Sequence, residues 1–127
     1  MDLNKFTERS KEILNSAQVL AMMQNHQLLQ PVHLLSGIIE DDDTASLLLA
    51  PAGLDLKSIK SSIEKELKKF PAVTGNSSGI SASKEFIVTI EEAKKISKQK
   101  GDEYVPVESM QKAIEVIVNI AKLVAKQ

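Results

Sequence analysis

The chain has no cysteine and no tryptophan among its 127 residues, and aromatic residues make up only 3%. Without thiols it cannot form disulfides, cysteine-ligated zinc sites or a thiolate nucleophile. A core with so few aromatic side chains must be built from Leu, Ile, Val, Ala and Met, which favours packed helices over sheets. The lack of cysteine also fits a reducing compartment, so we expect a cytoplasmic protein.

No charge of one sign dominates the sequence. The 16 basic and 17 acidic residues are well mixed and give a formal net charge of −1, so there is no electrostatic footprint for nucleic acid or an anionic membrane. The start, MDLNKFTERSK, lacks the apolar stretch of a signal peptide. The apolar segment that begins near Val107 is interrupted by lysine and glutamate, which makes it too polar to span a bilayer.

Patterns that carry catalysis are also lacking. The loop at 71–80 has no Gly-Lys-Ser/Thr to cradle a phosphate. Its stretch GNSSG, residues 75–79, has the Gly-x-Ser-x-Gly spacing, but it belongs to a Gly- and Ser-rich linker and not to the strand-to-helix turn that a nucleophile elbow needs. We therefore expect no enzymatic activity and no cofactor in this chain. The two histidines, His26 and His33, lie on different sides of a turn without a third ligand, so we expect no metal site. We expect His33 to pack at a helix start and His26 to be exposed.

Helical spacing is present almost everywhere. Thr7 is a candidate N-cap for a first helix, Asn25 can adopt the left-handed conformation that ends it, and Pro31 suits the first turn of the next helix. The apolar positions of these two helices are Ile13, Leu14, Ala17, Leu20 and Ala21, then Val32, Leu34, Leu35, Ile38 and Ile39. The stretch NHQLLQPVHLL is therefore a corner between two helices.

The pattern continues with a short helix at 44–50 and a helix capped by Asp55. Ser83 can cap a further helix that ends at Gly101, and a final segment starts near Val107. The apolar faces are Leu56, Ile59, Ile63, Leu67 and Phe70 after Asp55, and Phe86, Ile87, Ile90, Ala93 and Ile96 after Ser83.

The second half of the chain repeats the first at an offset of 76 residues. Thr7 pairs with Ser83, Ala17 with Ala93, Asn25 with Gly101, Leu28 with Tyr104, and Leu34 with Met110. The corner returns without its histidines, because Asp102 and Ser109 take their places. We expect one domain, 1–127, with repeat one at about 1–70, a linker at 71–80 and repeat two at about 81–127. The halves should pack about a pseudo-twofold axis and leave an apolar groove at their seam.

Four segments carry a resemblance to a known family: MDLNKFT, LQPVHLL, LKKFPAVTG and KKISKQKGDEYVPVE. They resemble the N-terminal (Clp N) domain of the Clp ATPases, most closely of the ClpB-type protein disaggregases. The resemblance implies an all-α double Clp-N repeat that precedes AAA+ ATPase modules. It also implies a parent protein that is a homohexameric ATPase using ATP and Mg²⁺, with this domain as a monomer when isolated.

The resemblance also implies site residues. Thr7, Asp102 and Glu108 match family positions associated with client handling, and Ile90, Tyr104 and Met110 are the candidates for an apolar client groove. The chain departs from the family at the helix starts, where it has Gln30 and Pro106, and at Ser109, where an apolar residue is common.

Two functions follow from the resemblance and one rival from the corners. The first is recognition of exposed hydrophobic segments of unfolded or aggregated proteins and their delivery to the hexamer's pore. The alternative is docking of an adaptor protein, as in ClpA- and ClpC-type protease ATPases; DnaK-type chaperones are a further partner of the parent protein. Helix–turn–helix corners also occur in nucleic-acid binders, but the balanced charge argues against that partner.

Overall fold

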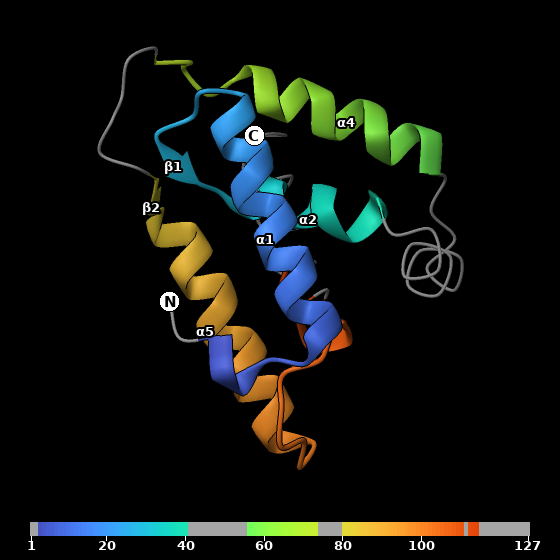
Figure 1. Cartoon of the computed structure of the whole chain (residues 1–127). Coiled ribbons are helices and arrows are strands. Elements are labelled where there is room, and N and C mark those ends of the chain that lie inside the picture. The colour runs from blue at the N-terminus through green and yellow to red at the C-terminus, as the bar shows by residue number, and fades with distance from the viewer. Residues whose placement is uncertain (1–2, 41–55, 74–79, 111, 115–127) are drawn as a thin grey trace, which may run out of the picture.

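The computed structural model describes residues 3–40, 56–73, 80–110 and 112–114, and this part of the chain is mostly helical (Figure 1). Its elements are η1 (Leu3–Lys5), α1 (Glu8–Met23), β1 (Leu28–Leu29), α2 (Pro31–Glu40), α4 (Leu56–Lys68), β2 (Ser81–Ala82) and α5 (Lys84–Gln99). Residues 107–110 and 112–114 are helical as well. The helix expected at 44–50, the cap Asp55 and the end of the final segment lie outside the described residues.

The expected helix boundaries are confirmed. The side chain of Thr7 accepts the N–H of Ser10 and caps α1, and the side chain of Ser83 accepts the N–H of Phe86 and caps α5. Each cap satisfies an N–H that has no partner inside its helix. Both helices are followed by a residue in the left-handed conformation, Asn25 with φ of 57° and Gly101 with φ of 80°. Phe70, which was expected on the helix after Asp55, lies beyond the end of α4.

The backbone hydrogen bonds repeat at the same offset of 76. Both α1 and α5 have 16 residues, and bonds at each cap and corner recur. The matched pairs are Lys11 to Thr7 and Ile87 to Ser83, His26 to Ala21 and Asp102 to Ser97, and His33 to Gln30 and Ser109 to Pro106, each from N–H to carbonyl. The two halves of the described chain are therefore built on the same backbone plan.

Two short parallel pairings join the halves. In the first, β1 pairs with β2 and places Leu29 opposite Ala82; in the second, Phe6 forms a bridge with Val105. Adding the repeat offset of 76 to the residue number maps Phe6 onto Ala82 and Leu29 onto Val105. The second pairing is thus the first with the halves exchanged, which is what a pseudo-twofold axis requires. The sequence did not reveal these strands, because two residues have no periodicity to detect.

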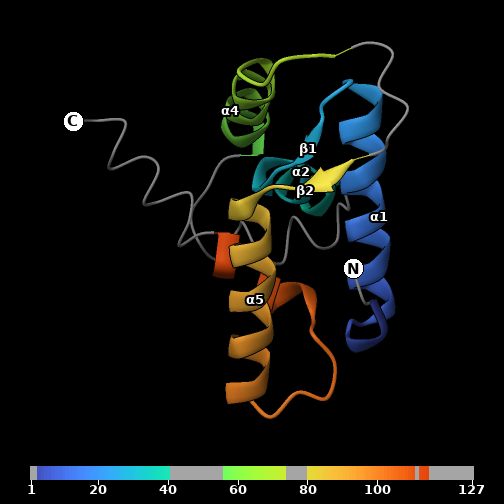
Figure 2. The ribbon, with the colours of Figure 1, turned by 90° about the vertical axis from the view of Figure 1, so that its left-hand side faces the viewer.

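Side chains from both halves share one core. Figure 2 shows α1 and α5 along two sides of the molecule, with the strand pair between their upper ends. The cluster contains Phe6, Ile13, Leu14, Ala17, Ala21, Leu29, Leu34 and Ile38 from the first half and Phe86, Ile90, Ala93, Val105, Val107, Met110, Ala113 and Ile114 from the second. Because the apolar faces complete one another, neither half can bury its own alone.

Helix α4 packs outside this shared core. A second, smaller cluster of Ile39 and Ile63, with Val32, Leu35, Ile59 and Leu67 partly buried against it, attaches α4 to α2. The outward side of α4 is charged and exposed. Within the described residues, none of the helices has the length and apolar character needed to cross a membrane.

Candidate binding surfaces

Four of the six predicted site residues lie at the second corner. Asp102, Tyr104 and Glu108 are exposed, and Thr7 is half-buried. Thr7, at the start of α1, lies beside the second corner because its N–H donates to the carbonyl of Val105 at 3.2 Å. Val105 directly follows Tyr104 in the chain. The start of α1 and the second corner therefore form one surface.

The other two predicted residues lie in the core. Ile90 is 5% exposed and Met110 is fully buried. Ile90 lies on the same face of α5 as Phe86, and Met110 is the counterpart of the buried Leu34. The expectation that these two side chains contact a client is corrected, because a partner at the surface cannot reach them.

Thr7 has a structural role that accounts for its position. Its hydroxyl donates to the hydroxyl of Ser10 at 2.9 Å, and Ser10 donates to the carbonyl of Val105 at 2.9 Å. The last bond is buried. This chain of hydroxyls ties the start of α1 to the second corner, so a change at Thr7 disturbs the surface beside it as well as the helix cap.

At the first corner, the two histidines are buried and contact each other. The prediction that His26 is exposed is wrong, since it is only 6% exposed. The chain turns back at Asn25, the N–H of His26 bonds to Ala21, and its ring packs edge-on against Phe70 with centroids 5.7 Å apart. Burial of His33 at a helix start is confirmed.

The histidine rings are held by hydrogen bonds. Nδ1 of His33 accepts the backbone N–H of Gln30 at 2.8 Å, and Nε2 of His33 lies 2.8 Å from Nδ1 of His26. Burial lowers the pKa of His33 to about 4 and also lowers the pKa of His26. Both rings are therefore neutral at pH 7. Across the described residues, no three side chains of His, Asp or Glu gather as a metal ion would need, and the facing nitrogens bond to each other.

The same positions at the second corner hold different chemistry. Asp102 is exposed, and the hydroxyl of Ser109 is buried without a hydrogen-bond partner among the described residues. Pro106, in the place of Gln30, has no N–H to donate. Nothing in this corner can form the bonds that hold His33.

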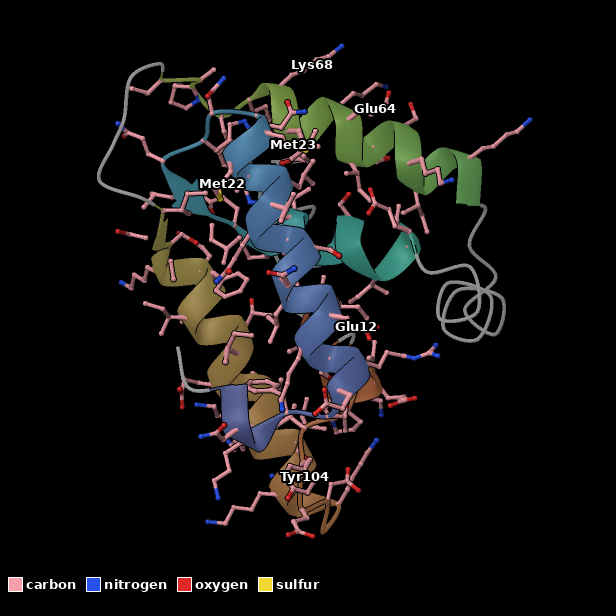
Figure 3. The ribbon with its side chains drawn as sticks, viewed as in Figure 1. Glu12, Met22, Met23, Glu64, Lys68 and Tyr104 are labelled. Atoms are coloured by element: carbon pink, nitrogen blue, oxygen red, sulfur yellow. The ribbon has the colours of Figure 1, made fainter. Side chains whose placement is uncertain are left out.

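Most of the exposed large apolar side chains lie on the elements around the strand pair, namely the end of α1, β1 and the start of α5. We call this surface the apolar end; it consists of the last two turns of α1, β1 and the first two turns of α5, with Val19, Met22, Met23, Leu28, Ile87 and Val88 exposed. Figure 3 shows Met22 and Met23 near one end of the molecule and Tyr104, the remaining large apolar side chain exposed in the described chain, at the opposite end. Ile87 was predicted to be buried, and this is wrong, since it is 52% exposed.

The apolar end has no counterpart at the other end. A shift of 76 replaces Val19 with Lys95, Met22 with Lys98 and Met23 with Gln99, and a shift back replaces Ile87 with Lys11 and Val88 with Glu12. Val19, Met22 and Met23 are spaced three and four apart, opposite the buried face of α1. That second apolar stripe is the sequence signal that would have revealed this surface.

Hollows in the surface occur on the first half. One, of about 280 Å³, lies between α1 and α2 and is lined by Glu12, Ile13, Ser16, Gly37 and Glu40. A smaller one, of about 70 Å³, lies beside His26 and Phe70. Because both are partly lined by polar side chains, they differ from the apolar groove expected at the seam.

The family model described as the Clp repeat (R) N-terminal domain matches residues 5–115. The chain belongs to this family. The expectation of an all-α Clp N domain is therefore confirmed, with two short strand pairings added to it.

Curated relatives of this Clp N domain are ClpB chaperones. The chaperone protein ClpB of Agrobacterium fabrum is 32% identical over 115 residues, covering 90% of this chain and 13% of that protein. The chaperone protein ClpB of Bacillus anthracis is 34% identical over 114 residues, covering 85% of this chain and 13% of that protein. The chain thus spans about 13% of the length of these relatives.

Solved structures share the fold. The Hsp104 N-terminal domain from Candida albicans matches with a TM-score of 0.82 and 25% identity, covering 94% of this chain and 81% of that one. A complex of the ClpV N-domain with a VipB peptide matches with a TM-score of 0.72 and 19% identity, covering 89% and 71%. The second likeness shows the fold alone.

Proposed function

We propose that this Clp N domain recognises exposed apolar segments of unfolded or aggregated client proteins and performs no catalysis itself. The observation that supports this most directly is the apolar end, where six large apolar side chains of α1, β1 and α5 are exposed. Surfaces of this kind are typical of protein interaction sites.

The chemistry of the apolar end suits clients of varied sequence. Met22 and Met23 are its most exposed members, and methionine side chains are flexible and polarisable, so they adapt to different partners. Fully burying an apolar side chain contributes about 1.5 to 3 kcal/mol, from which the ordering of the client must be subtracted. We expect a dissociation constant in the micromolar range or weaker for one domain.

Weak binding fits the parent protein that the ClpB relatives suggest. We propose that the domain precedes AAA+ modules, which would bind ATP and Mg²⁺ and form a homohexamer in the cytoplasm. Six weak domains on one hexamer would capture an aggregate by multivalency while each contact still releases quickly. Delivery of the client to the pore requires that release.

The second corner supports a second candidate, docking of an adaptor or a DnaK-type chaperone. Tyr104 is exposed there, with the exposed carboxylates of Asp102, Glu103 and Glu108 nearby in the chain. An aromatic anchor with a polar rim is typical of a site for one folded partner rather than for many unfolded ones. Thr7 would support this surface through its bonds to the corner.

The experiment uses the substitutions that the repeat itself supplies. The triple variant Val19→Lys, Met22→Lys, Met23→Gln gives α1 the outer surface of α5. We expect it to bind a fluorescently labelled, permanently unfolded protein at least tenfold more weakly in an anisotropy titration, about 1.4 kcal/mol, with an unchanged circular dichroism spectrum.

A charge-matched control separates apolar contact from electrostatics. The double variant Asn15→Lys, Gln18→Lys adds the same two positive charges to exposed positions of α1 and removes no apolar side chain. We expect it to bind within twofold of the unmodified domain. Equal losses in both variants, or no loss in the triple variant, would exclude the apolar end as the client surface.

A further inference from the structure

The two buried histidines form a line of hydrogen bonds between the start of α2 and the first corner. It begins at the N–H of Gln30, at the start of α2, and passes through the rings of His33 and His26. We call this line the imidazole ladder. Phe70, which follows the end of α4, packs against both rings, so the ladder lies beside a segment about forty residues away in the chain.

The ladder requires both rings to be neutral and fixes their tautomers. Nδ1 of His33 accepts from Gln30, so its proton is on Nε2 and is donated to Nδ1 of His26. The remaining proton of His26 is then on its Nε2. A further proton could be added only at a nitrogen that already accepts a hydrogen bond, so protonation of either ring breaks the ladder.

The ladder lies where α4 and the segment after it meet the first corner. The ring of Phe70 packs against both histidines, at centroid distances of 5.7 and 6.3 Å, and the N–H of Val73 donates to the carbonyl of Asn25 at 2.8 Å. Beyond the ladder, α4 is attached to α2 mainly by Ile39, Ile63 and their partly buried neighbours. This attachment is small compared with the shared core.

Among the described residues, no charged side chain packs against the two rings to compensate a proton on the ladder. The neighbours from the end of α1, from α2 and from 70–73 are uncharged. At the end of α4, Glu66 and Lys68 are exposed to solvent, and so is Lys69, which follows the helix. The pKa of each histidine is lowered chiefly by burial, and for His33 by the neighbouring His26 as well.

We propose that the imidazole ladder is a pH-sensitive switch: a proton added to it releases α4 from α2 and uncovers Val32, Leu35 and Ile39. The switch is a property of the fold and does not depend on the client-binding proposal. If clients do bind apolar surface, the uncovered side chains of α2 add to what the domain offers them under acid conditions.

The direction and size of the pH dependence follow from linkage. The folded pKa of His33 is about 4, below its ordinary value of 6.5, so the open state binds more protons than the closed state between these values. The stability of the closed state is complete above pH 6.5 and is lost as the pH falls toward 4. From His33 alone, the open population of α4 should rise about thirty-fold between pH 7.5 and pH 5.

Hydrogen exchange measured by mass spectrometry tests the switch. Each amide rate is divided by the rate of an unstructured peptide at the same pH, which removes the intrinsic pH dependence of exchange. We expect the protection of α4 to fall about thirty-fold between pH 7.5 and pH 5, while the protection of α5 changes less than threefold. Unchanged protection of α4, or an equal loss in α5, would overturn the proposal.

The double variant His26→Gln, His33→Gln is the matched control. A glutamine amide can accept a hydrogen bond with its oxygen and donate one with its nitrogen, as each neutral ring does, but it does not titrate. We expect the protection of its α4 to be the same at both pH values. A pH dependence that persists in this variant would contradict the proposal, and the comparison of α4 with α5 in the unmodified chain decides even if the variant fails to fold.

Discussion

The two corners of the molecule have the same backbone and opposite chemistry. Residues 26–33 and 102–109 make matched hydrogen bonds to the ends of α1 and α5. Yet the first corner holds two neutral, buried imidazoles beside an apolar surface, whereas the second presents exposed carboxylates and Tyr104. The comparison teaches that backbone bonds and core positions define the repeat, while the remaining side chains are free to specialise.

Two of these differences are linked through one hydrogen bond. In a capping box, the side chain three residues into a helix accepts the backbone N–H of the cap residue. His33 does this for Gln30 at 2.8 Å. Pro106 has no N–H, and the corresponding Ser109 is short and has no hydrogen-bond partner among the described residues. The three positions at which the chain departs from the family pattern, Gln30, Pro106 and Ser109, therefore all belong to the hydrogen bonding at helix starts.

The largest expected effect is at a core position where α1 and α5 carry different side chains. Phe86 is fully buried, and its counterpart Ser10 is buried too but bonds to Val105. We expect Phe86→Ala to lower the free energy of unfolding by about 3 to 5 kcal/mol, because it leaves a cavity. Ser10→Ala should lower it by about 1 kcal/mol through the lost hydrogen bond.

Urea denaturation followed by circular dichroism measures both variants. Similar losses for Phe86→Ala and Ser10→Ala would mean that the two halves contribute to the core alike at this position, and the expected asymmetry between α1 and α5 would be wrong.

A smaller effect sharpens the comparison of α2 with its counterpart. Gly37 corresponds to Ala113, but a Cβ on Gly37 would lie 2.9 Å from the carbonyl oxygen of Ile13. We expect Gly37→Ala to destabilise the fold by about 1 to 3 kcal/mol, because α1 and α2 must move apart. In a helix without this contact, the same substitution would stabilise by up to about 1 kcal/mol.

The sign of the change in the urea midpoint of Gly37→Ala therefore shows whether α1 and α2 are in close contact at this position. Ala113→Gly serves as the control, with an expected loss of about 1 kcal/mol from helix propensity. A stabilised Gly37→Ala variant would show that α1 and α2 are not in close contact.

Much of this fold could be predicted because its signals are local. Thr7, Ser83, Asn25 and Pro31 act on their own helix ends, so residue type and position were enough. The repeat was visible because the same signals recur at one offset. The family resemblance added the double-repeat architecture.

The rest depends on contacts between distant residues. His26 is buried because Phe70, from beyond α4, covers it. Ile87 was placed on the buried face of α5, but that face follows Phe86, Ile90 and Ala93 and leaves Ile87 at its margin. Met110 was predicted to line a groove at the surface, although its repeat partner Leu34 was already assigned to the apolar face of its helix. Single apolar positions thus could not be divided between core and surface by spacing alone.

The most direct test of the central claim compares one residue from each end. Leu28 and Tyr104 are counterparts in the repeat, 43% and 47% exposed. In an anisotropy titration with a labelled unfolded protein, Leu28→Ser should weaken binding about fivefold through the lost apolar contact, and Tyr104→Ser should leave it within twofold. A greater loss for Tyr104→Ser than for Leu28→Ser would contradict the claim that the apolar end recognises clients.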